Sequence, residues 1–364
     1  MKTLDQIEAR TPISSAPFTI SNPGSYYLTT NLTVSGGDAI TIAASGVTLD
    51  LSGFTITSTA PGAAGNGILI NSALRNLAIL NGFIQGGVTN NGGVYSGSGF
   101  GNGILAGGFS GYPQNARVNG VSVTGCLYSG IYLGNGDSTV VDSCTVRTAG
   151  SYGIVATTIK ASVAMDCGGD AIYGSQVTDC RGECTGSSYG VNASVAENCS
   201  GFSTSSHGVV ATTALNCYGY SSSATGLNAS TAGNCQGGST NGVGLNANTA
   251  LNCYGASTSG VGLNANTAQN CQGNSSTDIG LTAIMAQNCQ GNSNYIGLHA
   301  TSAQTCYGTA TGGGIGLYAV YIAIGCYGYT GSGTGLQSFI ANSCFGRNSS
   351  GIAQAIVWPS NMPP

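Results

Sequence analysis

The charged side chains of this sequence are few, and half of them gather in one region where they could do acid–base chemistry. Only 8 of the 364 residues are Lys or Arg and 12 are Asp or Glu, and ten of these twenty lie between positions 137 and 197. An enzyme that cleaves an acidic polysaccharide could use such carboxylates to hold Ca²⁺, and a Lys or Arg to remove the proton next to a uronate carboxylate. The candidate catalytic residues are Asp142, Lys160, Asp166, Asp170, Asp179 and Arg181.

The same cluster also fits an ordinary solvated surface, because pairings typical of polygalacturonase-like enzymes are missing from the chain. The sequence contains neither an Asp-Asp pair nor a Gly-His-Gly stretch, and its 2 histidines, His207 and His299, stand alone. The nearest approach to a zinc motif is Cys180-Arg-Gly-Glu-Cys184, which has no second pair of ligands. We therefore expect no metal and no cofactor, with Ca²⁺ needed only if the protein is a lyase.

Aromatic side chains offer a second kind of chemistry, the binding of sugars, because a pyranose can lay its apolar face on an aromatic ring. Two uncharged stretches, 86–102 and 106–115, interrupt the repeat of the sequence that is described below. Uncharged loops suit the binding of a neutral glycan better than catalysis. Alternatively, the aromatic residues of the repeat only stiffen a sheet. The candidate ligand-binding residues are Tyr95, Phe100, Phe109 and Tyr112 in those loops and Tyr218, Tyr254, Tyr307 and Tyr327 beside repeated cysteines.

The cysteines recur at a spacing that indicates architecture rather than chemistry. From Cys199 to Cys289 every step is eighteen residues, and all but one of the 14 cysteines follow this series, with Cys184 outside it. Stacked strands lie about 4.8 Å apart with parallel Cβ directions, whereas a disulfide needs Cβ atoms about 3.8 Å apart. We therefore expect one column of reduced, buried thiols. A neighbouring column, Asn198 to Asn288, is expected to form an amide ladder at a corner.

A period of eighteen residues with short β-like segments is typical of one turn of a β-solenoid. In the repeat Gly-[Leu/Val]-x-Ala-x-x-Ala-x-Asn-Cys-x-Gly, the Leu, Ala and Cys positions are expected to point inward and to form a narrow core. Segments 39–57 and 67–87 alternate with period two and predict three strands per turn. Because Asp142, Asp166 and Asp179 stand one or two places before cysteines of the series, we expect them to share one edge.

Three N-terminal stretches resemble the opening turns of right-handed parallel β-helix proteins of the pectin-lyase-like superfamily, as found among secreted bacterial proteins. They are NPGSYYLTTNLTV (22–34), GVTLDLSGFTI (46–56) and NLAILNGFIQG (76–86). The resemblance implies an all-β, right-handed parallel β-helix, and counting the repeats gives about sixteen turns. It implies no single function, because the superfamily includes lyases, hydrolases, adhesins and proteins without a known activity.

The repeat and its interruptions predict a single domain in four parts. Residues 1–17 are expected to cap the first turn, with a short helix around TLDQIEAR, and residues 351–364, which hold three prolines, to cap the last. Between the caps, 18–150 should form larger, irregular turns with loops at 86–116, and 151–350 should form regular eighteen-residue turns.

Composition argues against two classes of partner. Few Lys and Arg residues, without a run of them, cannot neutralise many phosphates of a nucleic acid, and no apolar stretch of about 18 residues exists to insert into a membrane. We expect an exported, rod-like protein, secreted or at the cell surface although MKTLDQIEAR has no signal-peptide core, that binds carbohydrate without catalysis. Its oligomeric state stays open. The alternatives are a polysaccharide lyase or glycoside hydrolase, and an ice-binding or adhesin-like protein suggested by the threonine column 213, 231, 249 and 267.

Overall fold

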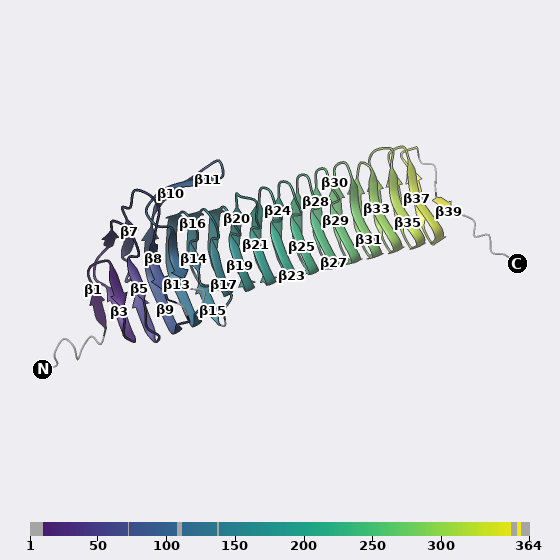
Figure 1. The fold of residues 1–364 in the computed structure, drawn as a ribbon. Helices are drawn as coiled ribbons and strands as arrows, with labels where there is room; N and C mark the ends of the chain where they lie inside the picture. The colour runs from purple at the N-terminus through teal and green to yellow at the C-terminus, as the bar shows by residue number, and fades with distance from the viewer. Residues whose placement is uncertain (1–9, 72, 108–110, 137, 351–354, 358–364) are drawn as a thin grey trace. The chain divides into compact units, whose positions relative to one another are not determined.

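The structure of the chain is a computed structural model. It describes residues 10–71, 73–107, 111–136, 138–350 and 355–357. The chain divides into two compact units, Met1–Ser194 (unit 1) and Val195–Pro364 (unit 2). Each unit is a stack of parallel strands, so the chain is a parallel β-helix repeat protein, as the sequence predicts (Figure 1). The right-handed coil stays a prediction, in keeping with the usual hand of parallel crossovers.

Unit 1 winds its strands into three parallel ladders, the three strands per turn that the sequence predicts. The first ladder holds β1 (Thr11–Ile13), β3 (Gly24–Leu28), β6 (Val47–Asp50), β9 (Arg75–Gln85), β13 (Gln114–Cys126), β15 (Thr139–Asp142), β17 (Ile154–Lys160) and β19 (Ile172–Thr178). The second holds β4 (Leu32–Val34), β7 (Thr55–Ser58), the later parts of β9 and β13, β16 (Thr145–Ala149), β18 (Val163–Cys167) and β20 (Arg181–Cys184). The third holds β2 (Phe18–Ile20), β5 (Ile40–Ile42), β8 (Asn66–Ile70), β12 (Asn102–Ala106), β14 (Ile131–Tyr132) and the first parts of β17 and β19.

The core of unit 1 follows from the alternation of apolar and polar residues along these strands. Ile40, Ile42 and Leu49 are fully buried, whereas Thr41 and Thr48 between them are partly exposed. Burying one such aliphatic side chain stabilises the fold by about 1.5–3 kcal/mol. The stack of turns therefore holds together chiefly through its aliphatic interior.

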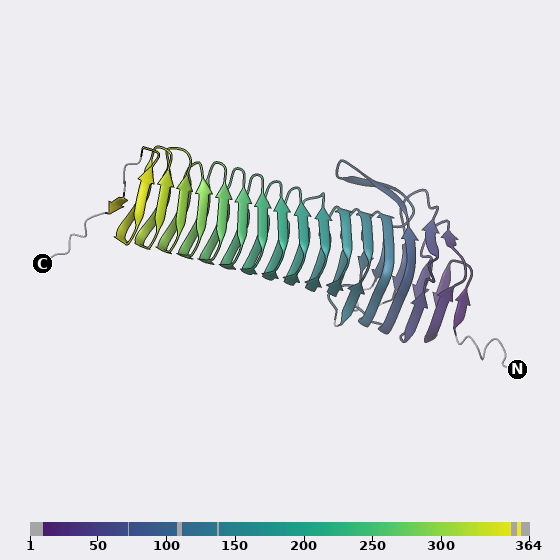
Figure 2. The same ribbon diagram turned by 180° about the vertical axis from the view of Figure 1, so that it is seen from behind.

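The uncharged stretch 86–102, expected as a loop, contains an antiparallel hairpin of β10 (Gly87–Asn91) and β11 (Val94–Ser98). Its turn is made by Gly92 and Gly93, whose φ angles of 63° and 95° favour glycine. β10 contacts β13 and β16, and Figure 2 shows the hairpin projecting from one edge of unit 1. The interruption of the repeat is therefore an ordered element on the side of the solenoid.

Unit 2 repeats one plan in every turn, with a long strand followed by a short one. The long strands are β23 (Val209–Leu215), β25 (Leu227–Gly233), β27 (Leu245–Leu251), β29 (Leu263–Gln269), β31 (Ile279–Gln287), β33 (Ile296–Gln304), β35 (Ile315–Ile324) and β37 (Thr334–Asn342). The three-residue strand β39 (Ala355–Val357) pairs with β37 at the end of this series. The short strands are β22 (Ser200–Ser203), β24 (Tyr218–Ser221), β26 (Gln236–Ser239), β28 (Tyr254–Ser257), β30 (Gln272–Ser275), β32 (Gln290–Ser293), β34 (Tyr307–Ala310), β36 (Tyr327–Thr330) and β38 (Phe345–Asn348). The strand β21 (Val191–Glu197) contains the division between the units.

The narrow core predicted from the repeat is present in unit 2. In one turn Leu245, Ala247, Ala250 and Cys253 are at most 5% exposed. The interior is so narrow that a Cβ atom added to Gly237 would lie 2.2 Å from the carbonyl oxygen of Gly244 on the opposite side. Glycine is therefore required at this inward position, and small side chains fill the rest.

The corners of unit 2 use asparagine in the left-handed backbone region. Asn216, Asn234 and Asn252 have φ angles of 52° to 53°, a conformation that asparagine tolerates better than most residues. The Asn216 amide donates to the Asn198 side-chain oxygen at 3.2 Å, and the Asn234 amide donates to the Asn216 oxygen at 3.3 Å. These bonds run from turn to turn along the corner.

The cysteines form two columns in unit 1 rather than the single series expected. One column, in the second ladder, holds Cys126, Ala149, Cys167 and Cys184. The other holds Cys144, Ser162 and Cys180. The sequence spacing does not reveal that there are two columns, because Ala149 and Ser162 take the place of cysteine on intermediate turns. All 14 cysteines are free, and every one except Cys344 is buried, as expected of stacked thiols.

The stack of turns begins and ends within the stretches expected as caps. β1 already pairs with β3, and β39 pairs with β37. The chain therefore has about 18 turns in its two units, against about sixteen expected from the repeats. The helix expected around TLDQIEAR lies outside the described residues, as do 351–354 and 358–364 of the C-terminal cap.

Candidate functional site

The candidate catalytic residues are divided between two ladders of unit 1. Asp142 and Lys160 are register neighbours in the first ladder, and Asp179 follows the end of β19 in the same ladder. Asp166 belongs to β18 in the second ladder, next to Cys167 and its column of Cys126, Ala149 and Cys184. The expectation that Asp142, Asp166 and Asp179 share one edge is therefore wrong. Among the described residues, no group of three or more His, Cys, Asp or Glu side chains could hold a metal ion.

Asp166 anchors the hairpin to the turns of unit 1. Its Oδ1 atom accepts hydrogen bonds from the Asn90 amide at 2.6 Å and from the Tyr95 hydroxyl at 3.2 Å, and its Oδ2 atom accepts one from Thr148 at 2.8 Å. The Thr185 hydroxyl lies 2.7 Å from that of Tyr95. One carboxylate thus holds both strands of the hairpin through neutral donors.

Tyr95, expected to bind a ligand, has a structural role in this network. Its side chain lies against Gly150 and Gly168, where added Cβ atoms would be 3.0 Å and 3.1 Å from it. Burial, the largest cause, raises the pKa of Tyr95 well above its usual value, so the hydroxyl stays protonated. The sequence did suggest both Tyr95 and Asp166 as functional residues, but their contact depends on the docking of the hairpin.

Asp170 and Arg181 are also used within the fold. Asp170 is 6% exposed, and its carboxylate accepts hydrogen bonds from the Tyr189 N–H at 3.1 Å and the Asn192 amide at 2.9 Å. Arg181 forms an ion pair with Glu183 at 3.7 Å. Arg181 and Glu183 thus belong to a polar, solvated surface, whereas the buried Asp170 carboxylate is used for hydrogen bonds within the fold.

A row of four tyrosines, Tyr112, Tyr132, Tyr152 and Tyr173, lies on consecutive turns of unit 1, and we call it the tyrosine surface. Successive ring centroids are 6.2, 6.0 and 6.4 Å apart, and the rings are tilted to one another by 52°, 58° and 39°. Tyr112 is 44% exposed and Tyr152 is 37% exposed. Exposed, tilted rings leave part of each face open to a ligand.

The tyrosine surface arises because two different positions of the turn supply its rings. Tyr132 and Tyr173 are in register with Val155 on the third ladder, and Val155 is buried. Tyr152, from the corner before β17, fills the place between them. Sequence reasoning identified Tyr112 but missed the other three. Their spacing of 20, 20 and 21 residues was the available signal, hidden by the period of eighteen.

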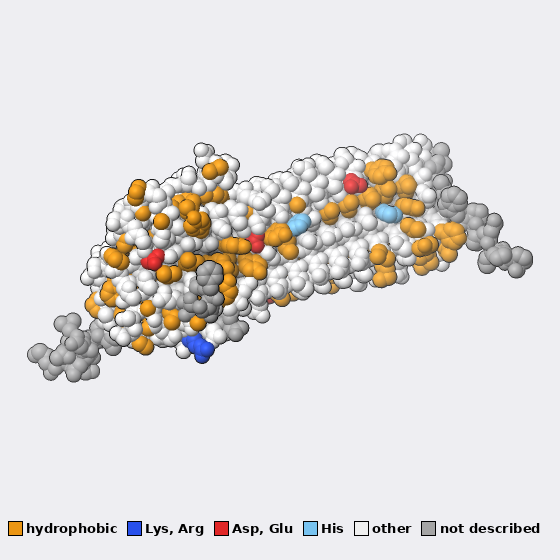
Figure 3. All heavy atoms as spheres, in the orientation of Figure 1, with side chains coloured by type: hydrophobic (Ala, Val, Ile, Leu, Met, Phe, Trp, Pro, Cys, Tyr) orange, Lys and Arg blue, Asp and Glu red, His pale blue; other side chains and the backbone are white. Residues whose placement is uncertain are grey.

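The Tyr132 hydroxyl of the tyrosine surface is protonated at neutral pH. Burial, followed by the hydrogen bond to the Tyr112 hydroxyl at 3.3 Å, raises the pKa of Tyr132 to about 12. On the face seen in Figure 3, hydrophobic side chains, a class that includes tyrosine there, gather on unit 1 with few charged side chains among them. Such a surface offers ring faces and hydroxyl groups, the two features that a neutral sugar can use.

Phe100, another candidate ligand-binding residue, is a core residue. Its side chain is 0% exposed, so the expectation is wrong. The chain returns from the hairpin at this point, and the large ring fills the interior where it re-enters the turn. Phe109 lies outside the described residues.

In unit 2 the candidates Tyr218, Tyr254, Tyr307 and Tyr327 share one outward column of the short strands. Tyr307 and Tyr327 are stacked, with centroids 5.0 Å apart and an interplanar angle of 1°, and Phe345 continues the stack at 5.6 Å. Parallel rings cover one another's faces. The outer parts of these stacked rings remain exposed, with Tyr307 39% and Phe345 52% exposed.

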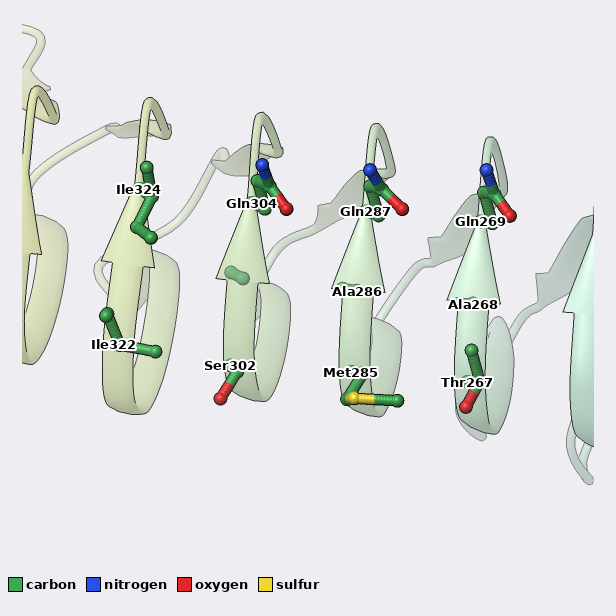
Figure 4. A pocket seen from close by; sticks show the side chains of 11 residues that line it. Thr267, Ala268, Gln269, Met285, Ala286, Gln287, Ser302, Gln304, Ile322 and Ile324 are labelled. Atoms are coloured by element: carbon green, nitrogen blue, oxygen red, sulfur yellow. The ribbon is translucent and has the colours of Figure 1, made fainter.

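The long strands of unit 2 form an apolar groove of ≈ 240 Å³ over β29, β31, β33 and β35. Figure 4 shows Gln269, Gln287 and Gln304 pointing alike along one side. The threonine column at positions 213, 231, 249 and 267 is in register, as expected, but the next turn has Met285, which is 55% exposed. The threonine array thus spans four turns and then gives way to apolar residues.

Comparisons with known proteins add little to this description. No protein-family model matches the chain, and no curated protein matches it. Among solved structures, the chain is similar to the Azotobacter vinelandii mannuronan C-5 epimerase AlgE4 A-module, with 14% identity and a TM-score of 0.35, over 92% of this chain and 91% of that chain. A likeness this distant assigns no activity. Among the described residues, no helix is long and apolar enough to cross a membrane.

Proposed function

We propose that this protein is an exported, non-catalytic β-helix that binds a neutral polysaccharide along its tyrosine surface. One observation carries the proposal: four tyrosine rings follow one another on consecutive turns, 6.0 to 6.4 Å apart and tilted by at least 39°. A pyranose binds an aromatic face through its apolar C–H groups. Because the rings repeat along the stack, the surface suits a chain of sugars better than a single sugar.

The chemistry of the tyrosine surface favours a neutral polysaccharide over an acidic one. A uronate or sulfate group is recognised by Arg or Lys, which pair with it electrostatically. The tyrosines instead supply hydroxyl groups, such as those of Tyr112 and Tyr132, and the chain has few cations in all. Binding of this kind needs no metal or cofactor.

The lyase or hydrolase alternative has weaker support. The Asp166 carboxylate already accepts hydrogen bonds from Asn90, Tyr95 and Thr148. Arg181 is not close to it along the sheet, because Arg181 is in register with Val163, three residues from Asp166. Three residues of a strand span about 10 Å.

Calorimetric titration of the whole chain with neutral and acidic polysaccharides tests the proposal. We expect binding to a neutral glucan, galactan or mannan, and we expect Tyr152→Ala to weaken it by about tenfold or more, since aromatic anchors carry much of such binding energy. Tyr128→Ala is the matched control, because Tyr128 is exposed in the same unit but outside the tyrosine surface.

The same samples decide between binding and catalysis. Incubation of an acidic polysaccharide with the protein and Ca²⁺ should release neither unsaturated nor reducing ends. If such ends appear and Asp166→Asn abolishes them while the variant stays folded, the protein is an enzyme and the proposal fails. It also fails if no neutral polysaccharide binds.

A further inference from the structure

A shallow hollow of ≈ 410 Å³ lies on the outward side of the short strands of unit 2, over β24, β26, β28 and β30. Ligand pockets of about 300–1,000 Å³ hold small molecules. Gly238 and Ala256 line the middle of the hollow, and Tyr218, Tyr220 and Tyr254 lie around them. None of its lining residues is charged.

The hollow exists because one outward column loses its side chains for two turns. The column runs Tyr220, Gly238, Ala256, Asn274 and Asn292 in register. Further along, the Asn292 amide donates to the Asn274 oxygen at 2.9 Å, so side chains fill that part of the column. Two turns of the column therefore carry only Gly and Ala over about 10 Å of the stack, and the Tyr220 ring lies against the first of them.

Gly238 is not required by the backbone. A Cβ atom added there would have tyrosine side-chain atoms as its three nearest neighbours, at 3.2 to 3.9 Å, with the Tyr220 ring closest. At the adjacent Gly237, by contrast, an added Cβ would meet a carbonyl oxygen at 2.2 Å. The fold therefore requires glycine at 237, whereas at 238 the nearest neighbours of an added Cβ are tyrosine side chains and not backbone.

The groups around the hollow suit a polar molecule that has one apolar face. The Tyr220 ring lies beside Gly238, held by a hydrogen bond of 2.9 Å between its hydroxyl and that of Thr240. The Tyr254 hydroxyl accepts a hydrogen bond from the Asn274 amide at 2.8 Å, which leaves its own proton for another acceptor. Gln236 is exposed at the same place.

We propose that this hollow binds a single neutral pyranose, with the apolar face of the sugar against the Tyr220 ring. Tyr254 donates a hydrogen bond to a sugar hydroxyl, and Gln236 both donates and accepts. The site takes the same class of ligand as the tyrosine surface, but it lies in the other unit and does not depend on that surface.

Saturation-transfer NMR of the whole chain with methyl β-glucoside, methyl β-galactoside and methyl α-mannoside tests the site. We expect one of them to bind with millimolar affinity. Gly238→Asn, which gives this position the residue that the column has at 274 and 292, should weaken binding at least tenfold. Thr309→Asn, in the same column outside the hollow, should change it less than twofold.

The outcomes separate this site from the proposed function. If none of the three glycosides binds the wild type, or if Gly238→Asn binds like the wild type, the hollow is not a sugar site. Tyr220→Leu, which keeps an apolar side chain but removes the ring, is a second test and should also weaken binding at least tenfold. Tyr152→Ala should leave glycoside binding unchanged, and a loss there would assign the signal to the tyrosine surface and overturn the site.

Discussion

The two aromatic arrays of this protein present their rings in different ways. In the tyrosine surface of unit 1 neighbouring rings are tilted by 39° to 58°, whereas Tyr307 and Tyr327 of unit 2 are parallel to within 1°. The centroid spacing differs as well, 6.0 to 6.4 Å against 5.0 Å. Tilted rings keep part of their faces open, and parallel rings cover one another.

The difference comes from the regularity of the repeat. Tyr307 and Tyr327 occupy equivalent positions of consecutive turns and are in register, so their side chains leave the sheet in the same direction and stack. Tyr132 and Tyr152 occupy different positions of their turns, because Val155 is the register partner of Tyr132. Equivalent positions of the repeat thus let Tyr307 and Tyr327 pack against each other, whereas the different positions of Tyr132 and Tyr152 hold their rings at a tilt.

The largest expected difference between the two arrays is the loss of polysaccharide affinity when two rings are removed from each. The double variant Tyr132→Ala/Tyr152→Ala is expected to weaken polysaccharide binding at least 100-fold, since an aromatic anchor contributes about 2 kcal/mol and 1.4 kcal/mol is about tenfold. The matched variant Tyr307→Ala/Tyr327→Ala should change the same affinity less than twofold. Titration calorimetry with the best neutral polysaccharide measures both, and equal losses would show that ring tilt does not matter.

The repeat made the core of unit 2 predictable from the sequence. Leu245 and Ala247 alternate as in a strand, and the steps of three residues to Ala250 and Cys253 indicate a bend, so the repeat predicts all four as inward positions, and all four are indeed buried. The two cysteine columns were harder to recognise, because Ala149 and Ser162 take the place of cysteine on intermediate rungs. Residues belong to one column when their strands are paired in register. Their identity reveals this register only where every turn has the same residue at that position.

The candidate site depended on contacts that no local pattern encodes. The hydrogen bond from Tyr95 to Asp166 joins residues 71 positions apart and requires the hairpin to fold onto later turns. The tyrosine surface combines a corner residue, Tyr152, with strand residues such as Tyr173, so its members share no position in the repeat. The sequence showed that 86–102 interrupts the repeat, where the hairpin lies, but it could not say which side chains meet.

A single ring should contribute more to stability in the stacked array than at an isolated position. Tyr327 has a ring on either side, Tyr307 and Phe345, and each aromatic pair contributes about 0.5–1.5 kcal/mol. Tyr327→Ala should therefore lower the free energy of unfolding by about 1–3 kcal/mol. The control Tyr295→Ala, at an exposed site of the same unit, should cost about 0.5 kcal/mol or less. Urea denaturation followed by circular dichroism compares them, and equal midpoints would contradict a stabilising stack.

The smallest effect concerns the tyrosine hydroxyls, and it appears only at high pH. Burial raises the pKa of Tyr132 from 10.0 in an ordinary environment to about 12. The contribution of the protonated hydroxyl to the free energy of unfolding is therefore fully present below pH 10 and is lost as the pH rises through 12. The contribution of Tyr132 to polysaccharide binding should accordingly be constant from pH 6 to 10 and decline as the pH rises through 12. Ultraviolet difference spectroscopy of phenolate formation measures the titration directly.

Tyr132→Phe should remove that late-titrating group while weakening binding less than twofold, since the ring remains. A larger loss would mean that the hydroxyl, rather than the tilted ring face, holds the sugar.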